Sequence, residues 1–220
     1  MSGADARGIF LSFAYVLAVL LGCDLVRRLR RISADATRKV VHIAVGMWIF
    51  PTLFLFRHWA WALLPPLVFA VLNALSLRFR LFGAIEVGEP SWGTVLFPVS
   101  VALLLAIFWR IGRPEIAASG VMAMTWGDAM AAVVGRAFGK RGYSLWGKRK
   151  TWLGSLAFLS WSTLAITLTL RFLGHYVPPT AFGHGLLAAL AGAVVEALSP
   201  RGTDNLTVPL ATGGVLFALL

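Results

Sequence analysis

The sequence is dominated by long apolar runs that contain few or no charged residues. A helix needs about 17 to 25 predominantly apolar residues to cross the hydrocarbon core of a bilayer, and most of these runs have that length. The runs cover residues 8–26, 40–56, 59–77, 93–109, 114–138, 154–173, 180–199 and 206–220. Pro65 and Pro66 interrupt the third run and Glu196 the seventh, so seven or nine spans also fit. The sequence predicts an all-α, polytopic transmembrane bundle of about eight helices, forming one integral-membrane domain over residues 1–220.

Composition excludes a water-soluble domain and argues against nucleic acid as a partner. Hydrophobic residues make up 59% of the chain, charged residues only 13%, and the mean hydropathy is +0.81. This leaves too little polar surface to cover a soluble fold. The formal net charge is +11, but the basic residues interrupt apolar runs instead of forming one stripe. A membrane surface or an anionic substrate is therefore the expected partner, and the lone Cys23 excludes an internal disulfide.

The charged residues cluster at one membrane face. Fifteen of the twenty Lys and Arg residues fall in loops that share one side when the N-terminus is placed outside. Loops rich in Lys and Arg are retained on the cytoplasmic side of a membrane. Seven of the nine carboxylates fall on that same side, namely Asp24, Asp35, Glu86, Glu89, Asp128, Glu196 and Asp204. The sequence thus predicts a multi-pass inner-membrane protein with its N-terminus outside and its active site facing the cytoplasm.

The strongest chemical signal lies at the inner end of the fifth run, in residues 125–142. An Asp inside an apolar helix costs about 2.5 to 3.5 kcal/mol on insertion, so Asp128 is predicted to be a metal ligand or proton acceptor, with helix pairing as the alternative. Ala131, Gly135 and Gly139 recur every four residues. This small face predicts either helix packing or close approach of a phosphate. Arg136 and Lys140, one turn apart, could hold phosphates or anchor the helix at the membrane surface.

A basic segment, GYSLWGKRKTWLGS, follows at 142–155. It matches the spacing G-x-x-x-x-G-K, but Arg149 replaces the Ser or Thr that holds magnesium in a P-loop, and no strand is predicted before it. A P-loop is therefore rejected. The remaining interpretation is a glycine-bearing cationic loop that leads into a helix and binds phosphate. Its candidate residues are Lys148, Lys150, Thr151, Gly154 and Ser155, and ordinary inside-facing charge is the alternative.

Two further clusters face the same side. Residues 38–46 open the second run and place His42 just inside the membrane boundary, beside the cations Arg38 and Lys39. His42 is a candidate base, and the alternative is a histidine that is hydrogen-bonded within the helix packing. Residues 196–213 contain Asp204, which we interpret as a second metal ligand, followed by Asn205. The alternative for Asp204 is an ordinary N-cap, since Asp is common just before a helix.

Together these segments resemble the polyprenol kinase family, which groups phytol kinases, dolichol kinases and CTP-dependent diacylglycerol kinases and is distantly similar to CDP-diacylglycerol synthases. The matching pieces are RKVVH (38–42), GEPSWGTVLFP (88–98), GDAMAAVVGRAFGK (127–140), KTWLGS (150–155) and TDNLTVPL (203–210). They occur in the family's order over about 170 residues, which is more specific than any single piece. One departure is Leu153, where many relatives carry an acidic residue before the glycine.

The resemblance implies transfer of the terminal phosphate of a nucleoside triphosphate, typically CTP with Mg²⁺, to the hydroxyl of an isoprenoid alcohol dissolved in the membrane. Asp128, His42 and Lys140 would then be catalytic, with Asp128 the first candidate for the general base, before His42 and Glu196. Asp128 and Asp204 would hold the metal. The predicted nucleotide-binding residues are Arg38, Lys39, Gly127, Arg136, Gly139, Lys140, Lys148, Lys150, Thr151, Gly154, Ser155 and Asn205.

Three alternatives stay open on the sequence alone. The nearest is a diacylglycerol kinase or cytidylyltransferase on the same scaffold, and the lack of an extra acidic cluster at 140–155 disfavours the cytidylyltransferase. A small secondary transporter would carry charges near the midplane and often an internal repeat, neither of which is found here. A non-catalytic scaffold would not need an Asp in the membrane. The sequence leaves the lipid alcohol, the nucleotide base and the oligomeric state open.

Overall fold

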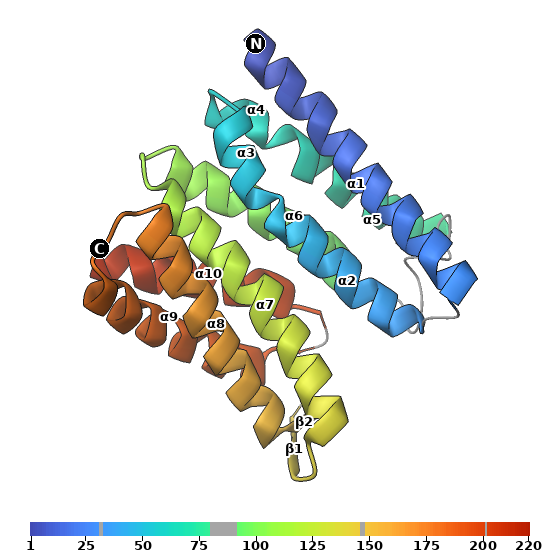
Figure 1. The fold of residues 1–220 in the computed structure, drawn as a ribbon, viewed down its shortest axis with the longest axis vertical. Helices are drawn as coiled ribbons and strands as arrows, with labels where there is room; N and C mark the ends of the chain where they lie inside the picture. The colour runs from blue at the N-terminus through green and yellow to red at the C-terminus, as the bar shows by residue number, and fades with distance from the viewer. Residues whose placement is uncertain (31–32, 80–91, 146–147, 201) are drawn as a thin grey trace.

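The computed structural model describes residues 1–30, 33–79, 92–145, 148–200 and 202–220. The chain forms helices almost throughout, with one short hairpin (Figure 1). The helices are α1 (Gly3–Arg30), α2 (Ala34–Met47), α3 (Ile49–Leu55), α4 (Trp59–Ala62), α5 (Leu64–Phe79), α6 (Gly93–Leu104), the π-helical turn η1 (Leu105–Trp109), α7 (Pro114–Phe138), α8 (Trp152–Phe172), α9 (Pro178–Leu198) and α10 (Asp204–Leu219). The strands are β1 (Gly142–Leu145) and β2 (Lys148–Thr151).

The predicted helical bundle is confirmed, and each of the eight apolar runs corresponds to one helical span. Within the described residues, six helical segments are long and apolar enough to cross a membrane, and two more, Gly93–Trp109 and Asp204–Leu219, are apolar but shorter. The third span consists of two helices, α4 and α5, that meet at Leu63, and Pro65 and Pro66 lie in the first turn of α5, where a proline needs no backbone donor. The two helices still form one candidate span, Trp59–Phe79. Glu196 lies inside α9 without breaking it. The chain is therefore an integral membrane protein of the multi-pass type.

Helix α1 is longer than its apolar run, which ends at residue 26. Its last turn is held by Asp24, which pairs with Arg27 at 2.9 Å and with Arg28 at 2.7 Å. Pairs three and four residues apart on a helix face each other and stabilise it, and basic residues suit the negative end of the helix dipole. The helix thus continues past the apolar run into a charged turn.

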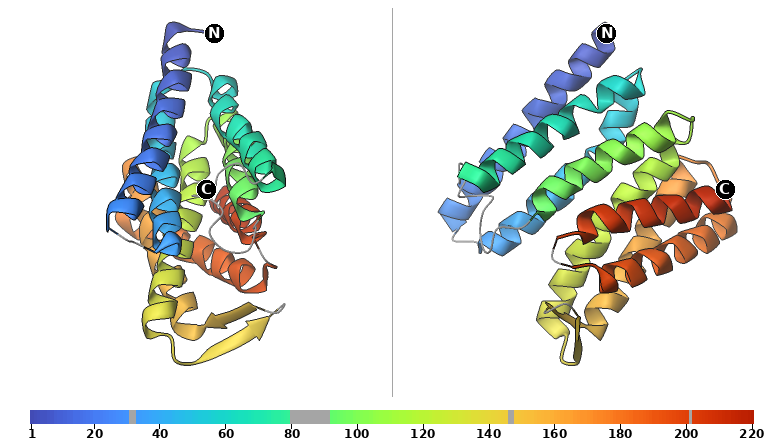
Figure 2. Two further views of the ribbon diagram at one scale, coloured as in Figure 1. Left: turned by 90° about the vertical axis from the view of Figure 1, so that its right-hand side faces the viewer. Right: turned by 180° about the vertical axis from the view of Figure 1, so that it is seen from behind.

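Helix α7 is the centre of the molecule (Figure 1). It packs most extensively against α8 and also contacts α2, α3, α6 and α10. The residues from Glu115 to Thr125 are all buried, and most are Ala, Gly, Ser or Met. Small side chains allow helices to approach closely in a membrane, where lipid is as apolar as the helix surface. Figure 1 and the view from behind in Figure 2 show α1 at the outer edge and the α8–α10 group toward the opposite side of the molecule.

Close approach of α2 to α7 depends on Gly46. A Cβ placed on Gly46 would overlap the Thr125 side chain, whose Oγ1 donates to the Val121 carbonyl at 2.8 Å. We expect Gly46→Ala to lower the free energy of unfolding by about 1 to 3 kcal/mol, because a well-packed core cannot absorb the extra carbon. Thermal unfolding in detergent would measure this. Gly22→Ala is the matched control, since a Cβ there meets nothing within 4 Å, and Thr125→Ala should partly rescue the variant.

Candidate active site

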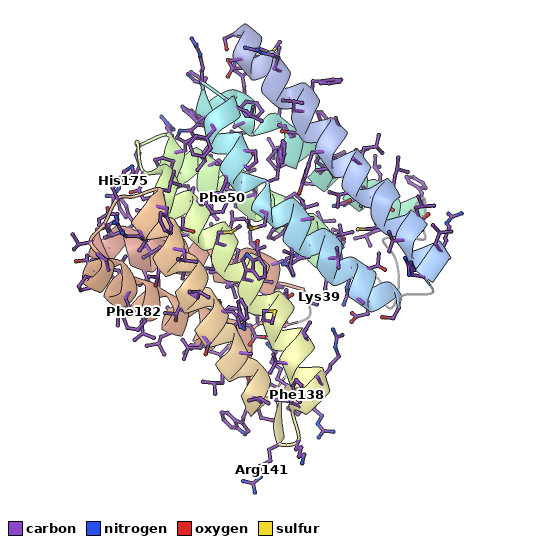
Figure 3. All side chains as sticks on the ribbon, viewed as in Figure 1. Lys39, Phe50, Phe138, Arg141, His175 and Phe182 are labelled. Carbon is purple, nitrogen blue, oxygen red and sulfur yellow. The ribbon has the colours of Figure 1, made fainter. Side chains whose placement is uncertain are left out.

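The helix connections separate into two groups at opposite ends of the bundle. Both termini lie at one end with the turns at 56–58, 110–113 and 173–177, whereas the β1–β2 hairpin and the turn between α9 and α10 lie at the other, here called the hairpin end (Figures 1 and 2). Figure 3 shows Lys39, Phe138 and Arg141 toward the hairpin end and His175 toward the opposite one. The predicted residues on the hairpin and at the adjoining helix ends therefore lie toward the hairpin end, whereas His42 and Asp128 lie inside α2 and α7.

The centre of the site is an ion pair between α2 and α7. Lys39 Nζ lies 2.5 Å from Asp128 Oδ2, and the two side chains are 13% and 24% exposed. Helix α2 is started by Ser33, whose side chain accepts a hydrogen bond from the Ala36 amide. The pair compensates for placing the Asp128 carboxylate in an apolar helix, since a removed partner would leave an unpaired charge. The remaining exposure of Asp128 leaves the carboxylate accessible to a ligand.

His42 lies beside this pair, one turn further along α2. Its Nε2 lies 3.4 Å from the carbonyl of Met124, one turn before Asp128 on α7. Its ring packs on Phe97 of α6, with ring centroids 4.7 Å apart. The structure thus gathers His42, Lys39 and Asp128 between α2 and α7.

Asp204 is the first residue of α10 rather than its N-cap, because helix geometry begins there and Thr203 takes the capping position. Its Oδ1 accepts hydrogen bonds from the backbone amide and the side-chain Nδ2 of Asn205, both at 3.0 Å. The residue is 7% exposed. A carboxylate in a first helical turn is stabilised by the helix dipole. Asn205 therefore orients the Asp204 carboxylate at the hairpin end.

The basic segment after α7 is a hairpin, not the loop that the sequence predicted. Strands β1 and β2 are antiparallel, with Tyr143 opposite Lys150 and Gly142 opposite Thr151. Thr151 caps α8 by accepting the Gly154 amide at 3.0 Å, and Ser155 bonds the Tyr143 hydroxyl at 2.7 Å. The side chain of Lys148 lies outside the described residues, as do 88–91 of the GEPSW segment. The rejection of a P-loop agrees with this geometry, because the glycine–lysine spacing spans two strands of one hairpin.

The small face of α7 packs against the start of α8. A Cβ on Gly135 would come within 2.8 Å of Thr151 Oγ1, and one on Gly139 within 2.6 Å of the same atom. Gly154 faces the Ala131 carbonyl from the other side. Deeper in the membrane, Gly127 approaches Ser162 and Phe158 of α8. Of the two alternatives for this face, helix packing is therefore observed, while contact of Gly127, Gly139 or Gly154 with a nucleotide stays a prediction.

The remaining predicted cations differ in their surroundings. Asp35 pairs with Arg38 at 2.9 Å and also with Arg136, so it ties α2 to α7 nearer the surface. Lys140 is exposed and forms no ion pair with any residue that the structure describes. Asp35 was not predicted as part of the site, although its position three residues before Arg38 suits a helical pair. Arg38 and Arg136 are thus paired with Asp35 rather than with Asp128.

The donors at the site suit Mg²⁺, although the described residues contain no group of three or more His, Cys, Asp or Glu arranged to hold a metal. Mg²⁺ prefers oxygen ligands and is commonly bound by one or two carboxylates together with substrate phosphates and waters. Asp128 and Asp204 supply carboxylates of that kind, and each is partly or fully shielded from solvent. A metal that arrives with a nucleotide therefore fits this donor set better than a permanent all-protein site.

Comparison with known proteins places the chain in a family. No family model matches the sequence, and no solved structure matches it. The chain is 35% identical over 211 residues to a phytol kinase of Synechocystis sp., covering 94% of this chain and 89% of that protein. It is 31% identical to the probable phytol kinase 2 of Glycine max, and the match covers 86% of this chain and 67% of that protein. It is 27% identical to a probable phytol kinase of Triticum aestivum, and that match covers 98% of this chain and 77% of the relative. The chain therefore belongs to the phytol kinase family, and with it to the kinases that act on an alcohol.

Proposed function

We propose that this protein transfers the terminal phosphate of a nucleoside triphosphate, with CTP as the first candidate, to the hydroxyl of phytol or a related isoprenoid alcohol. The observation that carries the proposal is the partly exposed Lys39–Asp128 pair with His42 beside it, in a membrane bundle whose hairpin end also carries Asp204 at the start of α10. Phosphoryl transfer requires mainly positioning and neutralisation of charge, which a few carboxylates and cations can supply. A site at the bundle end lets a polar donor and an apolar acceptor meet.

The acceptor oxygen forms a new bond to the terminal phosphorus, and the bond from that phosphorus to the bridging oxygen breaks, releasing the nucleoside diphosphate. The Asp128 carboxylate takes the proton that the alcohol loses, and His42 is the nearest second candidate. Asp128 and Asp204 are the residues that would hold Mg²⁺, whose charge would stabilise the phosphates. Lys39 and Lys140 would contact the transferred phosphate, with Arg38, Arg136, Lys148, Asn205 and the start of α8 around the rest of the nucleotide.

The hairpin end is proposed to face the cytoplasm, with both termini outside. The basic residues concentrate at this end, as expected for a cytoplasmic face. Nucleotides are then available to the site from solution, while the alcohol arrives from the bilayer. A transporter or a non-catalytic scaffold does not agree with membership of a family named for a kinase.

Purified protein in detergent should transfer label from terminally labelled CTP, with ATP in parallel, to phytol, geranylgeraniol or a long polyprenol. The expected product is a labelled isoprenoid monophosphate. Label that appears only in diacylglycerol would assign the neighbouring lipid kinase activity instead. A folded preparation that labels none of these lipids would refute the proposal.

A further inference from the structure

A second buried ion pair joins the hairpin to α9. Lys150 Nζ lies 2.6 Å from Glu196 Oε1 and also donates to the Glu196 main-chain carbonyl. The two side chains are 13% and 10% exposed, so the contact is more shielded than the Lys39–Asp128 pair. Glu196 thus binds the Lys150 ammonium twice, through its side-chain carboxylate and through its main-chain carbonyl. The ammonium of Lys150 is therefore already bound within the protein.

The same face of the hairpin has further attachments. Tyr143 lies opposite Lys150 in the register, so both side chains leave the ribbon on one face. Tyr143 bonds Ser155 at 2.7 Å and its ring packs on Trp152 of α8, with ring centroids 4.8 Å apart. The next residues along each strand, Ser144 and Arg149, are paired with each other and exposed on the other face. One face thus docks on the helices and the other is turned to the surroundings.

An isolated two-stranded hairpin is marginally stable in water, so its position depends on what it docks against. Lys150 joins the hairpin to α9, whereas Tyr143 joins it to α8. Thr151, the residue after Lys150 in β2, packs on Gly135 and Gly139 of α7, the helix that carries Asp128, so this attachment belongs to the same end of the bundle as the proposed phosphate site. A change at Glu196 would therefore move the hairpin's cations relative to that site.

We propose that Glu196 is a positioning residue of this kinase, which holds Lys150 and thereby fixes the β1–β2 hairpin where the phosphate donor binds. Lys150 then acts as the anchor of the hairpin rather than as a ligand of the nucleotide. The phosphates are then contacted by other cations whose position depends on this anchor, such as Arg149 on the exposed face of the hairpin and Lys140 just before β1. This inference rests on the proposed function for its kinetic part, while the anchoring itself is a property of the fold.

The first test is hydrogen exchange of the peptides that cover 142–151, followed by mass spectrometry. In Glu196→Gln and Lys150→Met the exchange of these amides should rise by about 10-fold or more, because a broken buried pair releases the hairpin. The reversed pair, Lys150→Glu with Glu196→Lys, should restore part of the protection. Unchanged protection in both single variants would overturn the proposal.

Steady-state kinetics is the second test. Glu196→Gln should raise KM for the nucleotide by about 10-fold or more and change KM for the alcohol less than about 2-fold, with the reversed pair again intermediate. Glu115→Gln is the matched control, since Glu115 pairs with Arg113 at 2.7 Å at the opposite end and is also 10% exposed. A released hairpin with an unchanged nucleotide KM would overturn the positioning role. A wild-type protein without kinase activity would overturn the proposed function and this kinetic part, whereas the exchange result would still decide the anchor.

Discussion

Replacing Asp128 with Asn is expected to lower phosphate transfer by more than about 1,000-fold, because Asn cannot accept the proton and its neutral carbonyl binds a divalent cation more weakly than a carboxylate does. The fold should tolerate the change better than the reaction does. Asn keeps the size of Asp, and the long side chain of Lys39 can turn its ammonium toward the aqueous end of the bundle. The measurement is the rate of isoprenoid phosphate formation, together with thermal unfolding of the same preparation.

Asp24→Asn is the matched control for this prediction. Asp24 forms two ion pairs at the end of α1, with Arg27 and Arg28, and has no part in the proposed chemistry. Surface pairs contribute little, so this variant should keep wild-type activity and nearly wild-type stability. An Asp128→Asn protein that retains a tenth or more of the activity would remove Asp128 from the reaction.

Replacing Lys39 with Met is expected to be the most destabilising single change at the site, by about 3 kcal/mol. The reason is the asymmetry of the pair. Asp128 has a short side chain on a central helix and is only 24% exposed, so removal of Lys39 leaves a largely shielded carboxylate without its counterion. Denaturant or thermal unfolding of the purified protein would measure the loss, and activity should fall as well because Lys39 would contact the phosphates.

The double variant Lys39→Met with Asp128→Asn separates the two effects. The double variant should regain most of the lost stability, because Met and Asn are close in size to the Lys and Asp that they replace and leave no buried charge. It should remain inactive. A double variant as unstable as Lys39→Met alone would show that the ion pair does not explain the stability. Recovered activity in the double variant would contradict the catalytic role of Asp128.

The membrane architecture was predictable because each span has its own sequence signal. A bilayer imposes a length of apolar sequence on every helix, so each of the eight runs could be located without knowledge of its neighbours. The exact ends were not predictable in the same way. Helix α1 runs to Arg30, past its apolar segment, because the Asp24 pairs continue it in the charged region.

The hairpin was missed because its signal is weak. Strands β1 and β2 are four residues each, and β2 reads Lys-Arg-Lys-Thr, in which Thr151 alone is β-branched and no residue is aromatic. What holds the hairpin is tertiary structure, namely Tyr143 on Ser155 and Lys150 on Glu196. Such contacts leave no pattern in the local sequence.

The residues of the candidate site were predictable one by one, but not their partners. The cost of a buried charge singled out Asp128, and the positions of Lys39 and His42 at a helix start were visible in the sequence. Lys39 and Asp128 are 89 positions apart, and Lys150 and Glu196 are 46 apart, so only the packing of the helices brings them together. The small face of α7 allowed two explanations, and its contact with Thr151 and Gly154 shows that packing is one of its roles.

The central claim is that this chain moves the terminal phosphate of a nucleotide to an isoprenoid alcohol. Its most direct test uses two preparations of CTP, one labelled at the terminal phosphate and one at the phosphate next to the ribose, each incubated with the purified protein and phytol. The account predicts label in phytyl phosphate from the first preparation only, with one CDP released for each phosphate transferred. Label in lipid from the second preparation, with release of diphosphate, would contradict it and identify a cytidylyltransferase.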